Sequence, residues 1–402
     1  MKVKINCGIA EGQITAPSSK SVAHRMLICA AFARGESRIF GITPCADVLA
    51  TIECLNGLGA KISLSGDTAV VDGFDVTKSS PKAPLFANES GSTLRFLIPP
   101  ALLSNKPIIF NGAPRLLERP MTVYEDICRS LGLKFERCKD RICVCGPLKA
   151  NSFKVRGDVS SQFITGLLFA LPLIGGGEIE ITTRLESKSY IDLTLDAMRE
   201  FGVSANWDGE NKIKVSKGEY RPRDVRVEGD WSAAAFPLAL NCVGGNVSII
   251  GLNDLSKQGD KVCEAHLLAL SKGPATISLH DCPDLGPILF AVAAACHGGE
   301  FTDTARLKIK ESDRAAVMAE ELSKFGAEIE VHENSVTIKK SALHTPVDLL
   351  FGHNDHRVVM SLSVLCTKFG GEIDGAEAVA KSYPAFFDHL SSVGIKANYY
   401  GN

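Results

Sequence analysis

One sequence pattern, here called the repeat phrase, occurs six times along the chain and restricts its fold more than any other feature. Each copy combines the end of an amphipathic helix, a glycine suited to a left-handed helix cap, and an alternating strand. The copies lie at residues 52–64, 127–144, 197–215, 267–279, 321–339 and 389–400, and the fourth is the weakest. Their glycines are Gly59, Gly132, Gly202, Gly273, Gly326 and Gly394. A repeat of roughly seventy residues is too long for a solenoid, so the phrase predicts six α/β units with paired strands.

The position of the copies predicts two similar domains. Three copies fall before about residue 229 and three after it. A chain of 402 residues is long enough for two hydrophobic cores. The boundary is expected within residues 220–236, where charged sequence with a proline gives way to small residues. The repeats leave open whether the first strand belongs with the second half.

Composition excludes several classes of partner. A net charge of −2 provides no basic field to hold nucleic acid or an anionic membrane. Thirteen scattered cysteines without a C-x-x-C pair indicate reduced thiols in a cytoplasm. The N-terminus alternates like a strand rather than a signal peptide, and no apolar run approaches the ~18 residues of a membrane span. We therefore expect a soluble, cytoplasmic protein.

Polar and cationic residues open five helices that are otherwise apolar. These helix starts lie within residues 16–25, 89–98, 158–172, 310–322 and 353–365. Free backbone N–H groups and the helix dipole attract anions, and Lys or Arg at the same end strengthens the attraction. One such start is usually only a helix cap. Five of them, with cations that demand anionic partners when desolvated, predict a cleft for a small, multiply anionic and phosphorylated ligand.

Other common catalytic motifs are missing from the sequence. It contains no P-loop, no dinucleotide-binding glycine pattern after a strand, no nucleophile elbow and no H-E-x-x-H. Residues 353–356, which read HNDH, offer two histidines and an aspartate to a metal, but Arg357 beside them would repel a cation. We therefore predict no metal site.

Seven motifs resemble those of the EPSP synthases (3-phosphoshikimate 1-carboxyvinyltransferases). In chain order they read PSSKSVAHR, ERPM, VSSQF, SKSYIDLTL, KESDR, NDHR and VAKSYPAFF. The resemblance spans essentially the whole chain. It implies an α/β fold of two domains, each of three βαβαββ units about a pseudo-threefold axis, the inside-out α/β barrel of the enolpyruvyl transferases. It also implies a discontinuous domain of residues 1–18 and 229–402, with residues 19–228 inserted as the other domain.

The resemblance also implies a reaction. The family transfers the enolpyruvyl group of phosphoenolpyruvate to the 5-hydroxyl of shikimate 3-phosphate and releases phosphate, in aromatic amino-acid synthesis. It implies no metal or organic cofactor, small-molecule substrates as the partners, no nucleic acid, no membrane, and a monomer. Closure of the two domains, with hinges near residues 15–20 and 228–231, is expected to assemble the site.

Site residues are carried over by matching motif positions. Shikimate 3-phosphate is expected to contact Lys20, Ser21, Arg25, Ser160, Ser161, Gln162, Ser187, Tyr190, Asp284 and Lys310. Phosphoenolpyruvate is expected to contact Lys20, Gly91, Arg119, Gln162, Arg314, Arg357 and Lys381. The implied catalytic residues are Asp284, which holds the 5-hydroxyl, Glu311, which protonates the methylene carbon, and Lys20, which touches both substrates. The chemistry needs two carboxyl groups in different protonation roles, and these two fit it.

The sequence departs from the family pattern at two places. Arg306 stands where the family often has Asn, and the loop NESGSTLRF carries Glu89 and Phe96 in place of the commoner residues. The second departure leaves open how strongly glyphosate, a competitor of phosphoenolpyruvate in the family, binds.

Three rival functions make different demands on the sequence. The sister enzyme that acts on UDP-N-acetylglucosamine usually has a Cys in a loop near the equivalent of NGAPRLLERP, and no Cys stands there. An RNA 3′-phosphate cyclase would need a nucleotide-linked His and a basic face. A non-catalytic phosphate-binding protein would not require Lys20, Asp284, Glu311 and Lys381 together.

Overall fold

The computed structural model describes residues 1–149 and 151–400. The chain splits into two compact units. The discontinuous unit comprises Met1–Ser19 and Gly229–Asn402, and the inserted unit comprises Lys20–Glu228. The first division follows Ser19, one residue after the division that the resemblance implies, and the second follows Glu228, at the same position as the implied one. Each unit has its own buried apolar core.

The inserted unit repeats one sheet topology three times within its described residues. The sheet orders are β14-β3-β5-β4, β6-β7-β9-β8 and β10-β11-β13-β12, and in each the first pair is parallel and the other two are antiparallel. The strands are β3 (Glu36–Phe40), β4 (Lys61–Ser65), β5 (Thr68–Asp72), β6 (Leu85–Phe86), β7 (Ile108–Asn111), β8 (Lys134–Arg137), β9 (Arg141–Cys145), β10 (Ser152–Val155), β11 (Gly176–Ile181), β12 (Ala205–Trp207), β13 (Lys212–Ser216) and β14 (Asp224–Arg226). The helices are α1 (Lys20–Phe32), α2 (Ala46–Leu58), α3 (Gly91–Ala101), α4 (Pro114–Glu118), α5 (Thr122–Ser130), α6 (Ser161–Ala170) and α7 (Lys188–Glu200), with the short 3-10 helices η1 (Val76–Lys78) and η2 (Leu171–Ile174).

The discontinuous unit has the same plan with one simplified member. Over the part of the chain that is described, its sheets are β16-β17-β19-β18, β20-β21-β1-β22 and the parallel pair β15-β2. The strands are β1 (Lys2–Ile5), β2 (Glu11–Thr15), β15 (Asn246–Ile250), β16 (Ala275–Ser278), β17 (Gly299–Thr302), β18 (Glu328–Val331), β19 (Ser335–Lys339), β20 (Leu350–Phe351), β21 (Gly371–Asp374) and β22 (Ala397–Tyr400). The helices are α8 (Trp231–Ala239), α9 (Cys263–Lys272), α10 (Gly286–Ala295), α11 (Arg314–Ser323), α12 (His356–Phe369) and α13 (Phe386–Ser392). Its 3-10 helices are η3 (Leu240–Val243), η4 (Gly259–Val262), η5 (Pro283–Leu285), η6 (Ala305–Ile309) and η7 (Ala376–Lys381).

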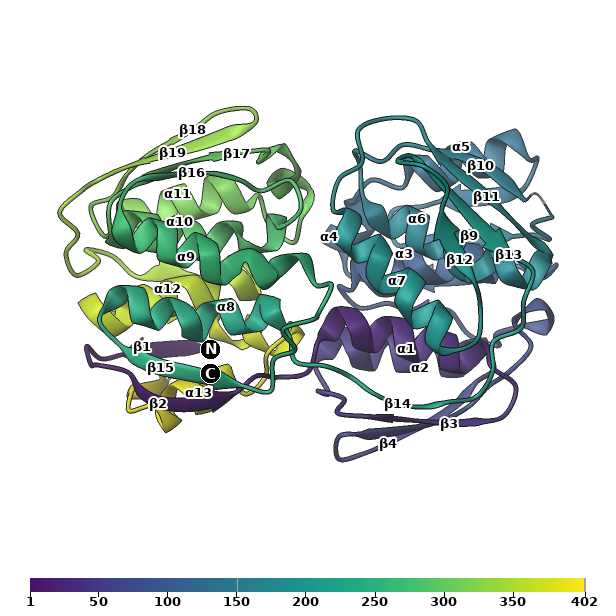
Figure 1. Ribbon diagram of the computed structural model, residues 1–402, viewed down its shortest axis with the longest axis horizontal. Coiled ribbons are helices and arrows are strands. Elements are labelled where there is room, and N and C mark those ends of the chain that lie inside the picture. Colours follow the sequence, from purple (N-terminus) through teal and green to yellow (C-terminus); the bar gives the residue numbers. More distant parts are fainter. Residues whose placement is uncertain (150, 401–402) are drawn as a thin grey trace. The chain divides into compact units, whose positions relative to one another are not determined.

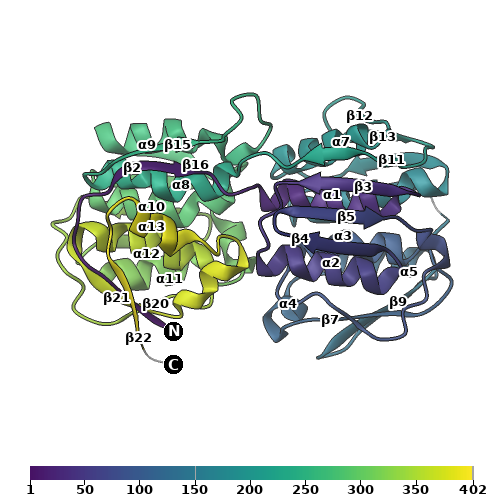
Figure 2. The same ribbon diagram turned by 90° about the horizontal axis from the view of Figure 1, so that it is seen from below.

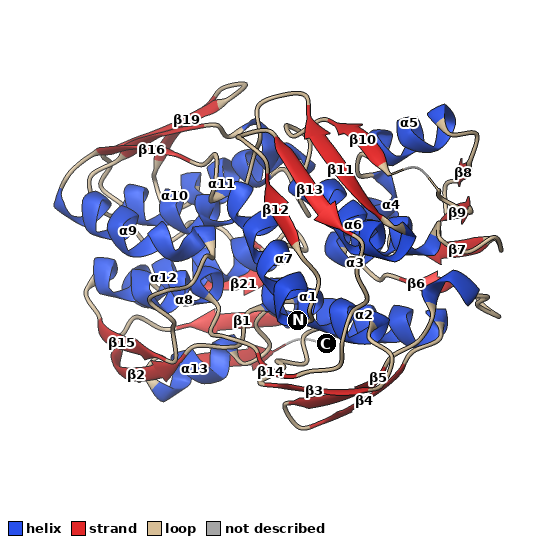
Figure 3. Ribbon diagram, turned by 45° about the vertical axis from the view of Figure 1, so that its right-hand side comes forward, coloured by secondary structure: helices blue, strands red, loops and turns tan. Residues whose placement is uncertain are grey.

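In each unit the sheets lie on the outside, and the central helices, α3 and α6 in one unit and α10 and α12 in the other, run through the interior (Figures 1, 2 and 3). Almost every residue of α3, α6, α10 and α12 is buried. A helix that is apolar on all sides is stable only when it is buried on all sides, which explains the long apolar runs of the sequence. None of the described helices combines the length and apolar character needed to cross a membrane.

The six-copy prediction was wrong at one glycine. Five of the glycines have φ between +65° and +133°, as a left-handed cap requires. Gly273, in the weakest copy, has φ 177°, which is extended backbone. The reason lies in the next strand along the chain. Here that strand is β16, which pairs in parallel at the edge of its sheet, whereas the strands after the five left-handed glycines all pair antiparallel.

Candidate active site

Lys20 opens α1 in the inserted unit, and its ammonium contacts the first turn of α2. Lys20 Nζ lies 2.8 Å from Asp47 Oδ2. The hydroxyls of Thr51 and Thr93 lie 2.6 Å from each other, and both are within 3.5 Å of the carbonyl oxygen of Asp47. Thr93 Oγ1 also lies 2.7 Å from Oγ of Ser90, the cap of α3. The polar groups at the starts of α1, α2 and α3 are therefore joined in one network.

Arg25 joins α1 to α7 from a buried position. Its guanidinium donates to the carbonyls of Ser21 and Tyr190 at 2.6 and 2.8 Å and to Thr194 Oγ1 at 2.9 Å. It also lies 5.1 Å from the centroid of the Phe96 ring. Burial lowers the pKa of Arg25 to about 10, so the side chain is still a cation at neutral pH.

Gln162, in the first turn of α6, is fixed by two residues of α3. Arg95 Nη1 donates to Gln162 Oε1 at 2.8 Å, and Gln162 Nε2 donates to Ser92 Oγ at 3.0 Å. Arg95 also donates to the carbonyl of Pro120 at 3.0 Å. Arg95 was not among the predicted site residues. The signal was an arginine inside an apolar helix, because a buried cation requires a defined set of acceptors.

Hydroxyls occupy the starts of α6 and α7. Ser160 caps α6 and accepts from Gln162 N at 3.3 Å, and Ser161 is the first residue of the helix. Ser187 precedes α7 with φ +56° and is almost fully buried, with Tyr190 one turn into the helix. Non-glycine residues rarely adopt such a conformation unless the surrounding structure holds it.

Gly91 and Arg119 meet at the start of α3. A Cβ added to Gly91 would lie 2.7 Å from Arg119 Nη1, so the guanidinium reaches the helix start only because this residue is a glycine. Arg137 donates to the carbonyl of Arg119 at 3.1 Å and to that of Leu117 at 3.0 Å, which fixes the loop after α4. Arg119 itself is buried.

Arg314 is the centre of the charged cluster in the discontinuous unit. The side chain is only 1% exposed. Its guanidinium lies 2.8 Å from Asp355 Oδ2, 2.6 Å from Glu311 Oε2 and 2.8 Å from Asp284 Oδ1. Ser312 Oγ adds a hydrogen bond to Asp355 at 3.0 Å. One cation therefore holds three carboxylates from three different segments of the chain.

Asp284 receives two further cations. Lys310 Nζ lies 3.1 Å from Asp284 Oδ1, and Arg357 Nη2 lies 3.1 Å from Asp284 Oδ2. Arg357 Nη1 also donates to the carbonyl of Asp284 at 3.0 Å. The cluster thus pairs the cations of Lys310, Arg314 and Arg357 with the carboxylates of Asp284, Glu311 and Asp355. An anionic ligand that binds here competes with the protein's own carboxylates for these cations.

Burial and neighbouring charges shift the pKa values in this cluster. Burial lowers the pKa of Lys310 to about 8, against the opposing effect of Asp284 and with a further lowering by Arg306. Burial acts to lower the pKa of Arg314, but Asp355, Glu311 and Asp284 raise it above its usual value. Burial likewise acts to raise the pKa of Asp355, and Arg314 reverses this, so that Asp355 stays ionised. Arg306, one of the two departures from the family pattern, therefore helps to lower the pKa of Lys310.

Asp260 is a carboxyl group that was not predicted from the sequence. It is 3% exposed and belongs to η4. Burial, followed by the charge of Asp284, raises its pKa to about 6. No helix-start pattern marks it in the sequence, and only the packing of η4 brings it into the electrostatic field of Asp284.

Lys381 lies at the end of η7 and donates to the carbonyl of Asn354 at 2.5 Å. The structure thus places its ammonium against the turn before α12. That turn begins at His353, the first residue of the sequence motif HNDH.

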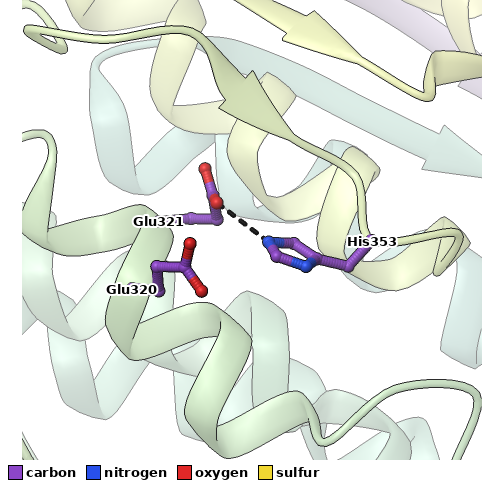
Figure 4. A group of neighbouring side chains, drawn as sticks. All are labelled: Glu320, Glu321 and His353. Carbon is purple, nitrogen blue, oxygen red and sulfur yellow. Dashed lines mark hydrogen bonds and ion pairs between the residues drawn. The ribbon is translucent and has the colours of Figure 1, made fainter.

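One group of side chains among the described residues has the composition of a metal site. Ligand atoms of Glu320, Glu321 and His353 lie within 4.8 Å of one another (Figure 4). However, both carboxylate oxygens of Glu321 accept from Lys324 Nζ, at 2.9 and 2.8 Å. An ammonium group already neutralises the buried carboxylate.

Comparison with known proteins identifies relatives along the whole chain. The model of the EPSP synthase (3-phosphoshikimate 1-carboxyvinyltransferase) family matches residues 8–390. The 3-phosphoshikimate 1-carboxyvinyltransferase of Clostridium kluyveri is 39% identical over 421 residues, which cover 98% of this chain and 97% of the relative. That of Clostridium perfringens is 36% identical over 419 residues, with 98% of both chains covered.

Solved structures show the same fold. The EPSP synthase of Acinetobacter baumannii superposes with a TM-score of 0.79 at 22% identity, over 99% of this chain and 100% of that one. The enolpyruvyl transferase NikO of Streptomyces tendae superposes with a TM-score of 0.78 at 14% identity, over 99% of this chain and 98% of that one. These likenesses confirm the expected fold class.

Proposed function

The chain belongs to the EPSP synthase family, and from this membership we propose that the residues described above carry out that family's reaction. The protein is an enzyme that transfers the enolpyruvyl group of phosphoenolpyruvate to shikimate 3-phosphate, a step of the shikimate pathway. The roles of individual residues are our proposal.

The inserted unit binds the phosphate of shikimate 3-phosphate. The hydroxyls at the helix starts and the cations of α1 supply donors to a phosphate, and the dipoles of α1, α6 and α7 favour its charge. The proposed ligands of the whole substrate are Lys20, Ser21, Arg25, Ser160, Ser161, Gln162, Ser187, Tyr190, Asp284 and Lys310. Support comes from the fixed geometry of Arg25 and Gln162, whose partners hold them at these helix starts.

Phosphoenolpyruvate is held by cations. Planar guanidinium groups grip carboxylate and phosphate with two hydrogen bonds each. The proposed ligands are Lys20, Gly91, Arg119, Gln162, Arg314, Arg357 and Lys381. At an effective dielectric near 20, one cation about 4 Å from a phosphate contributes on the order of 4 kcal/mol. Several cations are therefore sufficient to gather two anionic substrates.

Glu311 and Asp284 perform the proton transfers. Glu311 donates a proton to the methylene carbon of phosphoenolpyruvate while Asp284 accepts the proton of the attacking 5-hydroxyl, whose oxygen bonds to the adjacent carbon. The tetrahedral adduct then expels phosphate, which takes the proton held by Asp284, and the Glu311 carboxylate takes a proton back from the new methyl group to restore the double bond. Lys381 and Arg357 stabilise the departing phosphate. The observation that carries this assignment is that Arg314 brings the two carboxyl groups together, with contacts of 2.6 Å to Glu311 and 2.8 Å to Asp284. An anionic substrate that takes Arg314 from Glu311 leaves that carboxyl group able to take up the proton it donates.

A phosphate-release assay tests the function directly. We expect the purified protein to release inorganic phosphate from phosphoenolpyruvate only when shikimate 3-phosphate is present, with one enolpyruvyl ether formed per phosphate. UDP-N-acetylglucosamine in place of shikimate 3-phosphate should give no release. Release without an acceptor, or with the nucleotide sugar alone, contradicts the proposal.

We also propose that the enzyme works as a monomer in the cytoplasm. All cysteines of the described residues are free thiols, which fits a reducing compartment. Light scattering on the purified protein should give the mass of one chain.

Gly91→Ala should weaken phosphoenolpyruvate binding. The added methyl group would lie 2.7 Å from Arg119 Nη1, so the guanidinium must move. We expect the KM for phosphoenolpyruvate to rise about tenfold, equivalent to ~1.4 kcal/mol, with the KM for shikimate 3-phosphate unchanged. Gly273→Ala is the control, because Gly273 is extended and has no atom within 4 Å of the added methyl. An unchanged KM in Gly91→Ala would remove Arg119 from the site.

The pKa of Lys310 predicts an alkaline limit to substrate binding. The lowered pKa of about 8 means that Lys310 loses its charge as the pH rises through that value. The KM for shikimate 3-phosphate should therefore rise above pH 8. In Lys310→Arg the guanidinium stays charged, so the rise should disappear. A rise that persists unchanged in Lys310→Arg would assign it to another group.

A further inference from the structure

The turn before α12 has an unusual backbone. His353 and Asn354 have φ of +48° and +52°, and neither is a glycine. They lie between β20 and Asp355, whose carboxylate caps α12 by accepting from Arg357 N at 2.9 Å. Left-handed non-glycine residues cost free energy and persist only where surrounding contacts hold them. Two in succession require such contacts.

Glu321 supplies one set of these contacts from α11. It is fully buried. One carboxylate oxygen accepts from His353 Nε2 at 2.9 Å, and the other accepts from Phe351 N at 2.9 Å. Figure 4 shows the His353 ring facing this carboxylate, with Glu320 on the same helix. Glu321 therefore holds both the end of β20 and the first left-handed residue by hydrogen bonds.

Lys324 is a third residue that contacts the Glu321 carboxylate. Its ammonium donates to both Glu321 oxygens and, at 3.0 Å, to the carbonyl of Leu349. The charge of the carboxylate is thus balanced within the protein. A metal ion at this position would have to displace Lys324.

The other side of the turn meets Lys381. The carbonyl of Asn354 accepts from Lys381 Nζ at 2.5 Å. A carbonyl points in the direction set by the φ and ψ of its own peptide units, so the left-handed conformation of Asn354 determines where this acceptor lies. The position of the Lys381 ammonium consequently depends on the turn.

We propose that Glu321 is a positioning residue for phosphoenolpyruvate: through His353 it holds the left-handed turn whose Asn354 carbonyl aims Lys381. The inference rests on the proposed function, which assigns Lys381 to the phosphoenolpyruvate phosphate. If the His353 contact is lost, the turn relaxes, the Asn354 carbonyl rotates and Lys381 moves. The proposed ligands of shikimate 3-phosphate in the inserted unit are held by other elements. Asp284 is held by Lys310 and Arg314 as well as by Arg357, so binding of shikimate 3-phosphate depends little on this turn.

The test compares two substitutions of His353. His353→Ala removes the donor to Glu321, whereas Gln in His353→Gln places a side-chain N–H near the position of Nε2. A hydrogen bond to a charged group is worth enough for an effect of about tenfold. We expect His353→Ala to raise the KM for phosphoenolpyruvate about tenfold and to leave the KM for shikimate 3-phosphate unchanged. His353→Gln should lie within about twofold of the unsubstituted enzyme.

Two further variants separate positioning from other roles. Glu320→Gln alters the exposed neighbouring carboxylate and should have normal kinetics. Glu321→Gln should repeat the phosphoenolpyruvate effect in the folded fraction, measured by active-site titration with shikimate 3-phosphate. A merely structural contact would lower the amount of folded enzyme without changing one KM against the other.

Three results would overturn the inference. His353→Ala with an unchanged KM for phosphoenolpyruvate is the first, and an equal rise in both KM values is the second. The third is a rise in the KM for phosphoenolpyruvate after EDTA treatment of the unsubstituted enzyme that Zn²⁺ reverses, since the cluster would then be a metal site. If the unsubstituted enzyme is active, any of these results refutes only this inference. If the unsubstituted protein is inactive with both substrates present, the proposed function is refuted as well.

Discussion

Glu311→Gln is expected to lower kcat by about 10² to 10⁴, the usual contribution of a general acid or base, with little change in either KM. Glutamine keeps the size and polarity of the side chain but has no proton to give to the methylene carbon. Asp284→Ala should lower kcat by a similar factor, because the 5-hydroxyl would lose its proton acceptor. Steady-state phosphate release at saturating concentrations of both substrates measures the effect.

Asp313→Asn is the matched control for these variants. Asp313 lies two residues from Glu311 and caps α11 by accepting from Ala316 N at 3.2 Å. Asparagine caps helices equally well, so kcat should stay near normal. Near-normal turnover in Glu311→Gln or Asp284→Ala would exclude that residue from the proton transfers.

Asp355→Ala should destabilise the discontinuous unit by about 3 to 5 kcal/mol, the usual cost of removing one partner from a buried ion pair. Asp355 is fully buried and lies 2.8 Å from Arg314, which is 1% exposed. The substitution also removes the cap of α12. Asp355→Asn keeps an acceptor for that cap and should cost less.

Fluorescence can assign this loss to one unit. The chain has two tryptophans, Trp207 in the inserted unit and Trp231 buried in the discontinuous unit. In a Trp207→Phe background, Trp231 reports urea unfolding of the discontinuous unit alone. An unchanged midpoint in Asp355→Ala would contradict the central place given to the Arg314 cluster.

Local sequence rules predicted the elements that depend on local interactions. The glycine at the end of each amphipathic helix is left-handed at Gly59 and Gly326 because a short reversal into a hairpin needs that conformation there. At Gly273 the same phrase leads into an extended connection. The difference lies in the pairing of the next strand, which no feature of the local sequence records.

The sequence pattern could not predict which charged side chains pair with one another. The helix starts predicted cations that need anions, but the anions that Arg314 contacts come from residues 284, 311 and 355. Asp260 was missed for the same reason, because its role depends on segments far apart in the chain. The resemblance supplied the set of site residues, whereas the structure supplied the hydrogen bonds that fix them.

The central claim is that the cations and hydroxyls at these helix starts bind the two anionic substrates. A crystal structure of Glu311→Gln with phosphoenolpyruvate and shikimate 3-phosphate tests it most directly. We expect the shikimate phosphate within hydrogen-bond distance of Ser160, Ser161 and Ser187, and phosphoenolpyruvate in contact with Arg119, Arg314 and Lys381. Substrates bound elsewhere, with these side chains still in their present contacts, would contradict the claim.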